Sequence, residues 1–283
     1  MKTLKAVLVF LSFIIFLVAA SLGHILVTLV KPSRRRHLIN SLSCFLIRTL
    51  QKILGMRVSV KGHKEALKKN GNFIISRHVS YTDGLVLGGL IPAMLLSKSE
   101  IKNWPLIGLV VMISGTVFVD RRQKNKIPKC LEDMVRLLRE KINVVVFPEG
   151  TSTDGTVIKP FQTVFFRVPI GAQSSIVPVT ISYKSLNGEG ITPANKNDIY
   201  WYGQISFFKH LWNLFRFRFF DVEVTIHDKI PVGSYGDNSL DRKKLSQKCF
   251  NVICEAAGIQ PEISKEIEQE NGDFVLFARK STS

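Results

Sequence analysis

A histidine and an aspartate lie five positions apart in SRHVSYTDG, residues 76–84. The stretch follows a short apolar run, so we expect His78 in a loop and Asp83 at or just inside the start of a helix. If the loop folds back, the Asp83 carboxylate can accept a hydrogen bond from one imidazole nitrogen, which makes the other nitrogen a better base. The structural alternative is that Asp83, Ser80 or Thr82 caps the helix and His78 is an ordinary loop residue.

Two later stretches also carry groups that suit substrate binding. GTVFVDRR, residues 115–122, ends in two arginines, whose planar cations bind phosphate or carboxylate groups, although many such pairs are only solvated. VVVFPEGTS, residues 144–152, delivers Glu149, Gly150 and Thr151 into a loop directly after a very apolar strand. The carboxylate can accept a hydrogen bond from a hydroxyl or orient a base, and the glycine lets a substrate approach the backbone. A plain turn is the alternative.

The elements that would position these groups are short apolar runs separated by helical patterns. Seven runs are typical of strands: 57–62, 72–76, 93–97, 116–120, 143–147, 175–183 and 222–227. The clearest helical pattern is at 126–141. Runs that are apolar on both faces and alternate with helices predict an α/β domain, with a mostly parallel sheet flanked by helices. The polar stretches follow strands, where ligand sites of such sheets collect. Pro178, inside one run, predicts an edge strand or a bulge.

The N-terminal part of the chain has the pattern of a membrane segment. No formal charge occurs from Ala6 to Val30, and about 20 apolar residues suffice to cross a bilayer. The basic residues of 31–36 predict that the main domain stays on the cytoplasmic side. A monotopic helix in one leaflet and a cleaved signal peptide are the alternatives. The following stretch, 37–55, predicts an amphipathic helix that either packs on the core or lies on the membrane surface.

The net charge of +17 favours binding to a polyanion, either nucleic acid or an anionic membrane surface. The apolar N-terminal run favours membrane lipids and argues against nucleic acid. Residues 199–220 hold two of the three tryptophans and many other aromatic residues, interleaved with basic ones. They form either a second patch at the bilayer interface or an aromatic part of the core.

Taken in order, the four polar or proline-containing stretches resemble the glycerolipid acyltransferase family, typified by 1-acylglycerol-3-phosphate acyltransferases, over about residues 60–185. The family is marked by HxxxxD, a glycine followed by an arginine, FPEGT and an apolar block with VP. The resemblance implies His78 as the general base and Asp83 as its orienting partner. It also implies Arg121 as a ligand of the acceptor phosphate or a similar anion, with Glu149, Gly150 and Thr151 in the acceptor site.

The implied function is a membrane-bound O-acyltransferase. It would move a fatty acyl group from acyl-CoA or acyl carrier protein to the hydroxyl of a lysolipid, most directly 1-acyl-sn-glycerol-3-phosphate, giving phosphatidic acid in phospholipid biosynthesis. Three departures leave the acceptor open: Ser152 replaces the arginine of FPEGTR, and Gln162 and Val164 stand where a basic residue and a glycine are usual. The wording FPEGTSTDG is similar to the lyso-ornithine lipid acyltransferase branch.

The expected organisation is a membrane anchor with an amphipathic helix (1–56), an acyltransferase domain (57–260) and a polar C-terminal tail (261–283). We find no metal-ligand spacing, and direct attack on a thioester requires no cofactor beyond the acyl donor. Two other functions use the same features. A thioester or lipid hydrolase would direct the histidine–aspartate pair at water, and a membrane-binding protein would use no catalytic pair.

Overall fold

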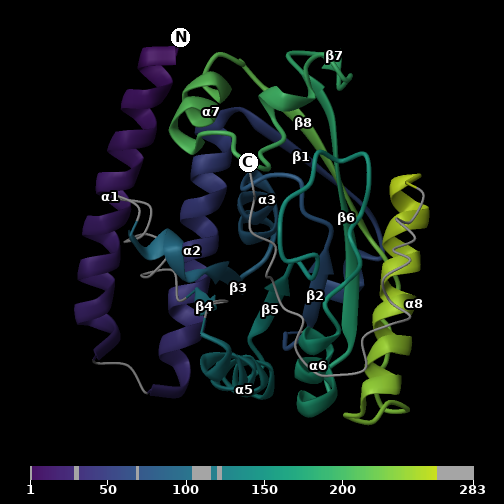
Figure 1. Cartoon of the computed structure of the whole chain (residues 1–283). Coiled ribbons are helices and arrows are strands. Elements are labelled where there is room, and N and C mark those ends of the chain that lie inside the picture. Colours follow the sequence, from purple (N-terminus) through teal and green to yellow (C-terminus); the bar gives the residue numbers. More distant parts are fainter. Residues whose placement is uncertain (1, 29–31, 68–69, 104–115, 120–122, 260–283) are drawn as a thin grey trace.

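A computed structural model describes residues 2–28, 32–67, 70–103, 116–119 and 123–259 of the chain (Figure 1). The α-helices are α1 (Lys2–Thr28), α2 (Pro32–Leu54), α3 (Thr82–Leu90), α5 (Ile127–Arg139), α6 (Arg167–Ala172), α7 (Phe207–Leu214) and α8 (Ser239–Ala257). The strands are β1 (Met56–Gly62), β2 (Phe73–Ser76), β3 (Ala93–Lys98), β4 (Val117–Val119), β5 (Asn143–Val146), β6 (Ile176–Leu186), β7 (Glu189–Gly190) and β8 (Phe220–Ile226). Short 3-10 helices lie at Lys64–Leu67, Ser99–Asn103, Lys124–Lys126, Thr163–Phe166 and Lys196–Asp198.

The described strands form one sheet in the order β1-β8-β6-β2-β5-β3-β4, with the short β7 paired to β6. Every pairing from β6 through β2, β5 and β3 to β4 is parallel, and β1 pairs with β8 in parallel. The β6–β8 and β6–β7 pairings are antiparallel. The prediction of a mostly parallel sheet flanked by helices is confirmed, and each of the seven expected runs forms a strand.

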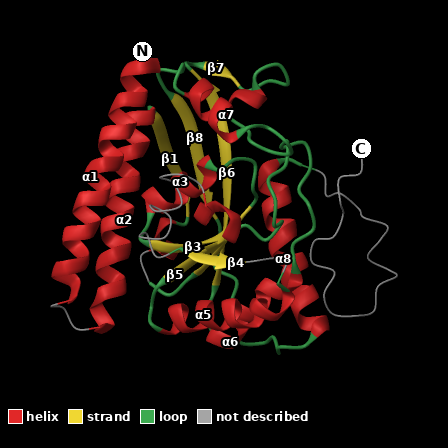
Figure 2. Cartoon of the chain, turned by 60° about the vertical axis from the view of Figure 1, so that its left-hand side comes forward, coloured by secondary structure: helices red, strands yellow, loops and turns green. Residues whose placement is uncertain are grey.

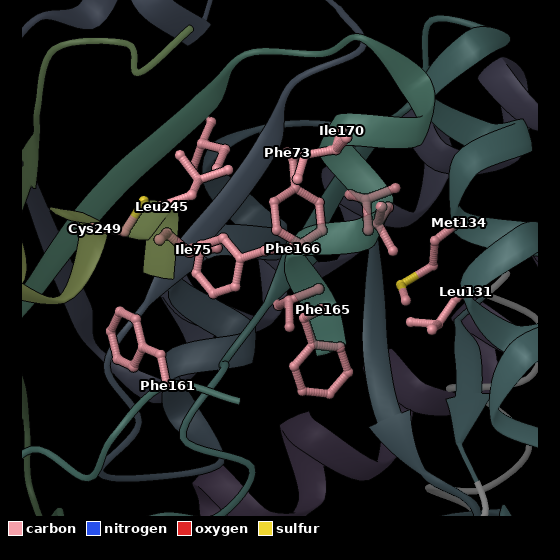
Figure 3. Close-up of a cluster of buried hydrophobic side chains, with 14 of the residues drawn as sticks. Phe73, Ile75, Leu131, Met134, Phe161, Phe165, Phe166, Ile170, Leu245 and Cys249 are labelled. Atoms are coloured by element: carbon pink, nitrogen blue, oxygen red, sulfur yellow. The ribbon is translucent and has the colours of Figure 1, made fainter. Parts of the chain in front are cut away.

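Each face of the sheet carries its own apolar core, because successive side chains along a strand point to opposite faces. Phe73 and Ile75 of β2 join the cluster that packs under α5, α6 and α8 (Figure 3). Ile74, between them in sequence, joins the cluster under α3 and α7 on the opposite face. The result is a three-layer arrangement of helices, sheet and helices, in which the central strands are buried on both faces (Figure 2).

Pro178 does not lie in an edge strand, contrary to the prediction, because β6 has β2 on one side and β8 on the other. The Pro178 carbonyl accepts a hydrogen bond from His227 N at 3.0 Å, immediately past the last residue of β8. In an extended strand the nitrogen of the same residue faces the same side as its carbonyl. The N–H that the proline lacks would have faced His227, just past the end of β8, so no hydrogen bond of the β6–β8 pairing is lost. The register shift in β6 falls instead at Tyr183/Ser185.

The predicted N-terminal helices are present as α1 and α2, which lie side by side (Figures 1 and 2). In α1, the Lys5 ammonium donates hydrogen bonds to the carbonyls of Leu54, Phe217 and Arg218, which fixes this end of the helix to the domain. Over the described part of the chain, no helix combines the length and apolarity needed to cross a membrane. The predicted transmembrane segment is therefore not confirmed.

Helix α2 packs on α3, as the core alternative for residues 37–55 predicted. The Gln51 amide donates to the carbonyl of Leu85 at 2.7 Å, and Arg48 Nε donates to the carbonyl of Gly89 at 3.0 Å. Because α3 begins within the stretch that carries His78 and Asp83, the packing of α2 on α3 also supports that stretch. The division at residue 56 stays a prediction, and the expected tail at 261–283 lies outside the described residues.

Gly55 makes the sharp turn from α2 into β1, and its replacement should destabilise the fold. Its φ is +78°, and an added Cβ would lie 2.2 Å from the carbonyl oxygen of Arg218. We expect Gly55→Ala to lower the free energy of unfolding in urea by more than the ~1–3 kcal/mol of backbone strain, because a backbone clash is added. Gly203→Ala is the matched control, since Gly203 has φ +59° and nothing within 4 Å of the added Cβ. Equal losses in the two variants would contradict this account.

Candidate active site

Two loops that carry the predicted site residues meet at one edge of the sheet. Strands β2 and β5 are parallel neighbours, so their carboxyl ends lie at the same edge. We call residues 77–81, after β2, the histidine loop, and residues 147–153, after β5, the glutamate loop. Both strands are fully buried, which gives the loops a rigid base. The chain thereby brings His78 and Glu149 together over 71 residues of sequence.

The histidine and aspartate form the predicted pair. His78 Nδ1 lies 2.9 Å from Asp83 Oδ2, and Asp83 has no exposed surface. The same carboxylate oxygen accepts the backbone N–H groups of Val79 at 2.8 Å and Ser80 at 2.9 Å. The expected hydrogen bond between Asp83 and one imidazole nitrogen is present, and Asp83 also binds the loop ahead of α3, whereas the N-cap residue of α3, Tyr81, makes no side-chain cap hydrogen bond.

The other imidazole nitrogen of His78 is available for chemistry. The ring stacks on Phe147, with centroids 4.4 Å apart and planes 19° from parallel. About a fifth of the side chain is exposed, at 21%. No group in the described ranges forms a hydrogen bond with Nε2. Held by Asp83 at Nδ1 and by Phe147 across its face, the ring can take a proton at Nε2.

Glu149 joins the two loops through its buried carboxylate. Oε1 accepts the backbone N–H of His78 at 2.6 Å, and Oε2 accepts that of Lys159 at 2.9 Å. Burial raises the pKa of Glu149 to about 7, while the two N–H donors and the charge of Arg77 oppose this rise. Glu149 is only 2% exposed. The expectation that it contacts the acceptor stays a prediction, and the structure gives it the further task of fixing the backbone of His78.

The glutamate loop also binds the backbone carbonyl of His78. Thr153 N donates to the carbonyl oxygen of His78 at 2.9 Å, so both backbone polar groups of the histidine are bound by this loop. Gly150 has φ +74° and donates to the carbonyl of Phe147 at 3.0 Å, which forms the turn. Gly150 is buried and Thr151 is half-buried beside these contacts. Their role in acceptor binding stays a prediction.

Arg121 lies outside the described residues, so its predicted contact with the acceptor has no structural account here. Across the described ranges, no group of three or more histidine, cysteine, aspartate or glutamate residues is arranged to hold a metal ion.

Two buried residues at the site escaped the sequence analysis. Arg77 precedes the histidine, donates from Nε to the carbonyl of Ile181 at 3.3 Å, and supplies a positive charge near Glu149. Tyr183, in β6, donates its hydroxyl to Asp83 Oδ1 at 2.7 Å. A signal for Tyr183 was present, because a tyrosine ended the predicted strand 175–183 at the edge where the polar stretches gather.

The histidine loop is also held by the aromatic segment at 199–220. The Tyr81 hydroxyl lies 3.1 Å from His210 Nδ1 of α7, and the Tyr81 ring packs edge-on against Phe207 and Trp201. Burial raises the pKa of Tyr81 and lowers that of His210, which favours the neutral form of both side chains. Tyr200, Phe215, Phe217 and Phe220 of this segment are buried in the core, as one of the two alternatives predicted, whereas Trp201 and Phe207 are half-buried.

The raised pKa of Glu149 predicts a pH-dependent stability. The group keeps its proton up to about pH 7 when folded and up to about 4.5 when unfolded, so its stabilising contribution is complete below 4.5 and is lost as the pH rises through 7. We expect the unfolding free energy of the wild type minus that of Glu149→Gln to fall by up to about 3 kcal/mol over this interval. Urea titrations at several pH values would measure it.

Glu189→Gln is the matched control for that titration, because Glu189 is exposed on β7. Its difference from the wild type should not vary with pH over the same interval. A difference for Glu149→Gln that is equally flat would show that burial does not hold the proton on Glu149.

Comparisons with known proteins identify the family to which the chain is similar. The acyltransferase family model matches residues 57–182, which include both loops. The lyso-ornithine lipid O-acyltransferase of Rhizobium meliloti (strain 1021) is 30% identical over 202 residues, covering 69% of this chain and 67% of that protein. The 1-acyl-sn-glycerol-3-phosphate acyltransferase of Neisseria gonorrhoeae is 29% identical over 120 residues, covering 42% and 47% respectively.

The fold also matches a solved structure, that of the 1-acyl-sn-glycerophosphate (LPA) acyltransferase of Thermotoga maritima. The TM-score is 0.62 at 17% sequence identity, over 91% of this chain and 97% of that one. At this identity the likeness concerns the fold alone. The chain therefore belongs to the acyltransferase family.

Proposed function

We propose that this enzyme transfers a fatty acyl group from a thioester donor to the hydroxyl of a lysolipid. The observation that carries the proposal is the arrangement of His78: Nδ1 is bound to buried Asp83, its backbone is bound on both sides by the glutamate loop, and its side chain is partly exposed. No nucleophilic side chain is required, because the lysolipid supplies the hydroxyl. The donor, acyl-CoA or acyl carrier protein, already carries an activated carbonyl and a good leaving group.

In the proposed reaction, His78 Nε2 takes the proton from the lysolipid hydroxyl as its oxygen attacks the thioester carbonyl. The new C–O bond forms, the C–S bond breaks, and the thiolate leaves. The imidazolium then returns the proton to the thiolate, so the enzyme ends unchanged. Asp83 keeps the proton of the neutral imidazole on Nδ1 and stabilises the imidazolium that forms in between.

For the acceptor, we propose lyso-ornithine lipid, with 1-acyl-sn-glycerol-3-phosphate as the second candidate. Ser152 adjoins Thr153, which contacts His78, so the arginine absent from this position would have stood at the site. An anionic phosphate therefore loses one cation here. The relative named for lyso-ornithine lipid also aligns with more of this chain than the one named for 1-acyl-sn-glycerol-3-phosphate. Arg121 remains the feature that favours the phosphate.

We also propose that the enzyme acts at a membrane surface, with the cytoplasmic side as the expected one. Several large apolar side chains of α1 are 42% or more exposed: Leu4, Val7, Leu8, Phe10, Leu11, Ile14, Ile15 and Val18. Most recur at spacings of three and four and so share one face of the helix. Phe208 and Trp212 of α7 are also exposed, at 59% and 49%. A helix face of this kind binds the bilayer interface without crossing it.

Replacing His78 tests the catalytic assignment. His78→Ala should lower kcat for acyl transfer by about 10²- to 10⁴-fold, the usual contribution of a positioned base, and leave the unfolding transition in place. The assay follows labelled acyl donor, on CoA or acyl carrier protein, into lyso-ornithine lipid and 1-acyl-sn-glycerol-3-phosphate. His63→Ala is the matched control, because His63 is exposed and follows β1, the edge strand that β8 and β6 separate from β2.

Near-normal turnover in His78→Ala would refute the assignment of the base. Release of free fatty acid at the same rate with and without a lysolipid would instead identify a hydrolase. Faster transfer to 1-acyl-sn-glycerol-3-phosphate than to lyso-ornithine lipid would reverse the proposed order of acceptors.

Replacing apolar residues of α1 tests the membrane proposal. The double variant Leu11→Asp and Ile15→Asp should reduce cosedimentation with phosphatidylglycerol-containing vesicles by about tenfold or more, because two charges would enter the apolar interface. Leu240→Asp is the control, since Leu240 is 60% exposed on α8, on the far side of the sheet from α1 (Figure 1). Equal binding of both variants would contradict the assignment of α1 as the docking face.

A further inference from the structure

Strand β6 extends past the end of β2 and over the start of α3. Their pairing ends at Ser76↔Val179, whereas β6 continues to Leu186. Tyr183 lies four residues beyond the last pair, about 13 Å farther along an extended strand. Its side chain shares a sheet face with Val179 and Ile181, in the cluster that includes residues of α3. The overhang therefore brings Tyr183 to Asp83, 100 residues away in sequence.

The Tyr183 hydroxyl is the middle member of a short hydrogen-bond chain that runs from Thr82 to Asp83. It donates its proton to Asp83 Oδ1 at 2.7 Å, so the Thr82 hydroxyl, 2.6 Å away, is the donor to the tyrosine oxygen. Asp83 Oδ2 already accepts from His78 and two backbone N–H groups. With Tyr183, both oxygens of the carboxylate are bound, and their assignment is fixed: Oδ1 faces the tyrosine and Oδ2 the imidazole.

The tyrosine is a donor that does not titrate in the working range. Tyr183 is buried, and burial, followed by the neighbouring charge of Asp83, raises its pKa well above the ordinary value. Its ring lies against Tyr200 at 5.8 Å between centroids, which restricts its position. The hydroxyl therefore stays protonated and points at the carboxylate whether His78 is neutral or charged.

We propose that Tyr183 is a positioning residue of the catalytic pair: its hydroxyl fixes the Asp83 carboxylate so that Oδ2 remains directed at His78 Nδ1. This inference rests on the proposed role of His78 as the base. Tyr183 acts through Asp83 and has no contact with the reacting groups. By drawing charge toward Oδ1, its hydrogen bond also moderates the attraction of Asp83 for the imidazolium, so the histidine can release its proton to the leaving thiolate.

Tyr183→Phe tests the inference, because it removes one hydroxyl and keeps the ring. We expect kcat to fall about 10- to 100-fold, as for loss of a hydrogen bond to a charged group, with KM for both substrates nearly unchanged. Without the donor, Asp83 attracts the imidazolium more strongly. The acidic limb of the pH profile of kcat should therefore move to higher pH. A purely structural role would lower the folded fraction and leave that limb in place.

A double-mutant cycle with Asp83→Ala isolates the route of the effect. Once the acceptor of the hydrogen bond is gone, adding Tyr183→Phe should not change the residual kcat further. An additional loss of the same size as in the wild-type background would overturn the inference. Tyr202→Phe is the matched control, because its hydroxyl donates to Asn197 at 2.9 Å rather than to the pair, and its kcat and pH profile should equal the wild type.

Thr82→Val supplies a second measurement that leaves the tyrosine in place. It removes the hydroxyl that donates to the Tyr183 oxygen and so weakens the same chain, moving the acidic limb in the same direction by a smaller amount. An unmoved limb in both Thr82→Val and Tyr183→Phe would overturn the inference. If His78→Ala is inactive and Tyr183→Phe is fully active with an unmoved limb, the inference fails and the proposed function stands.

Discussion

A buried carboxylate requires hydrogen-bond donors at both of its oxygens, and at Asp83 this requirement organises the whole site. The donors come from two places: the histidine loop supplies two backbone N–H groups and the imidazole, and β6 supplies the Tyr183 hydroxyl. The Asp83 side chain therefore fixes the histidine loop, the first turn of α3 and the C-terminal part of β6 relative to one another. Asp83 lies in the first turn of α3. Helix α2 packs against α3 and donates a hydrogen bond to it from Gln51, so the N-terminal helices also contribute to the rigidity of the pair.

The second buried carboxylate, Glu149, performs the same task on the backbone. It accepts hydrogen bonds from the backbone N–H groups of His78 and Lys159, and the N–H of Thr153 donates to the carbonyl of His78. The histidine thus has its ring, its N–H and its carbonyl all bound, while Nε2 stays available. Rigid placement of a base removes the cost of ordering it during the reaction. The two carboxylates differ in consequence: Asp83 acts on the imidazole, and Glu149 acts on the chain that carries it.

Helix α7 joins the exposed apolar surface to the histidine loop. Its exposed face carries Phe208 and Trp212, while its inner face places Phe207 and His210 against Tyr81 of the histidine loop. The carbonyls that follow α7 hold α1 through Lys5. The surface proposed to meet lipid is therefore linked to the site through a few direct contacts. Such an arrangement suits a substrate whose chain stays in the bilayer while its hydroxyl reaches a base on the protein.

The sequence by itself determined the elements, the family and the pairing of His78 with Asp83. Buried runs alternating with helices specified a mostly parallel sheet, and the positions of His78, Asp83 and Glu149 after strands placed them at one edge. It did not determine that Glu149 binds the backbone of His78, that Tyr183 binds Asp83, or that Pro178 lies in an interior strand. These depend on how far β6 extends beyond β2 and which neighbour each carboxylate oxygen meets. Such contacts join residues 71 to 100 positions apart, whereas sequence patterns report spacing along one element, so only the tertiary structure could decide them.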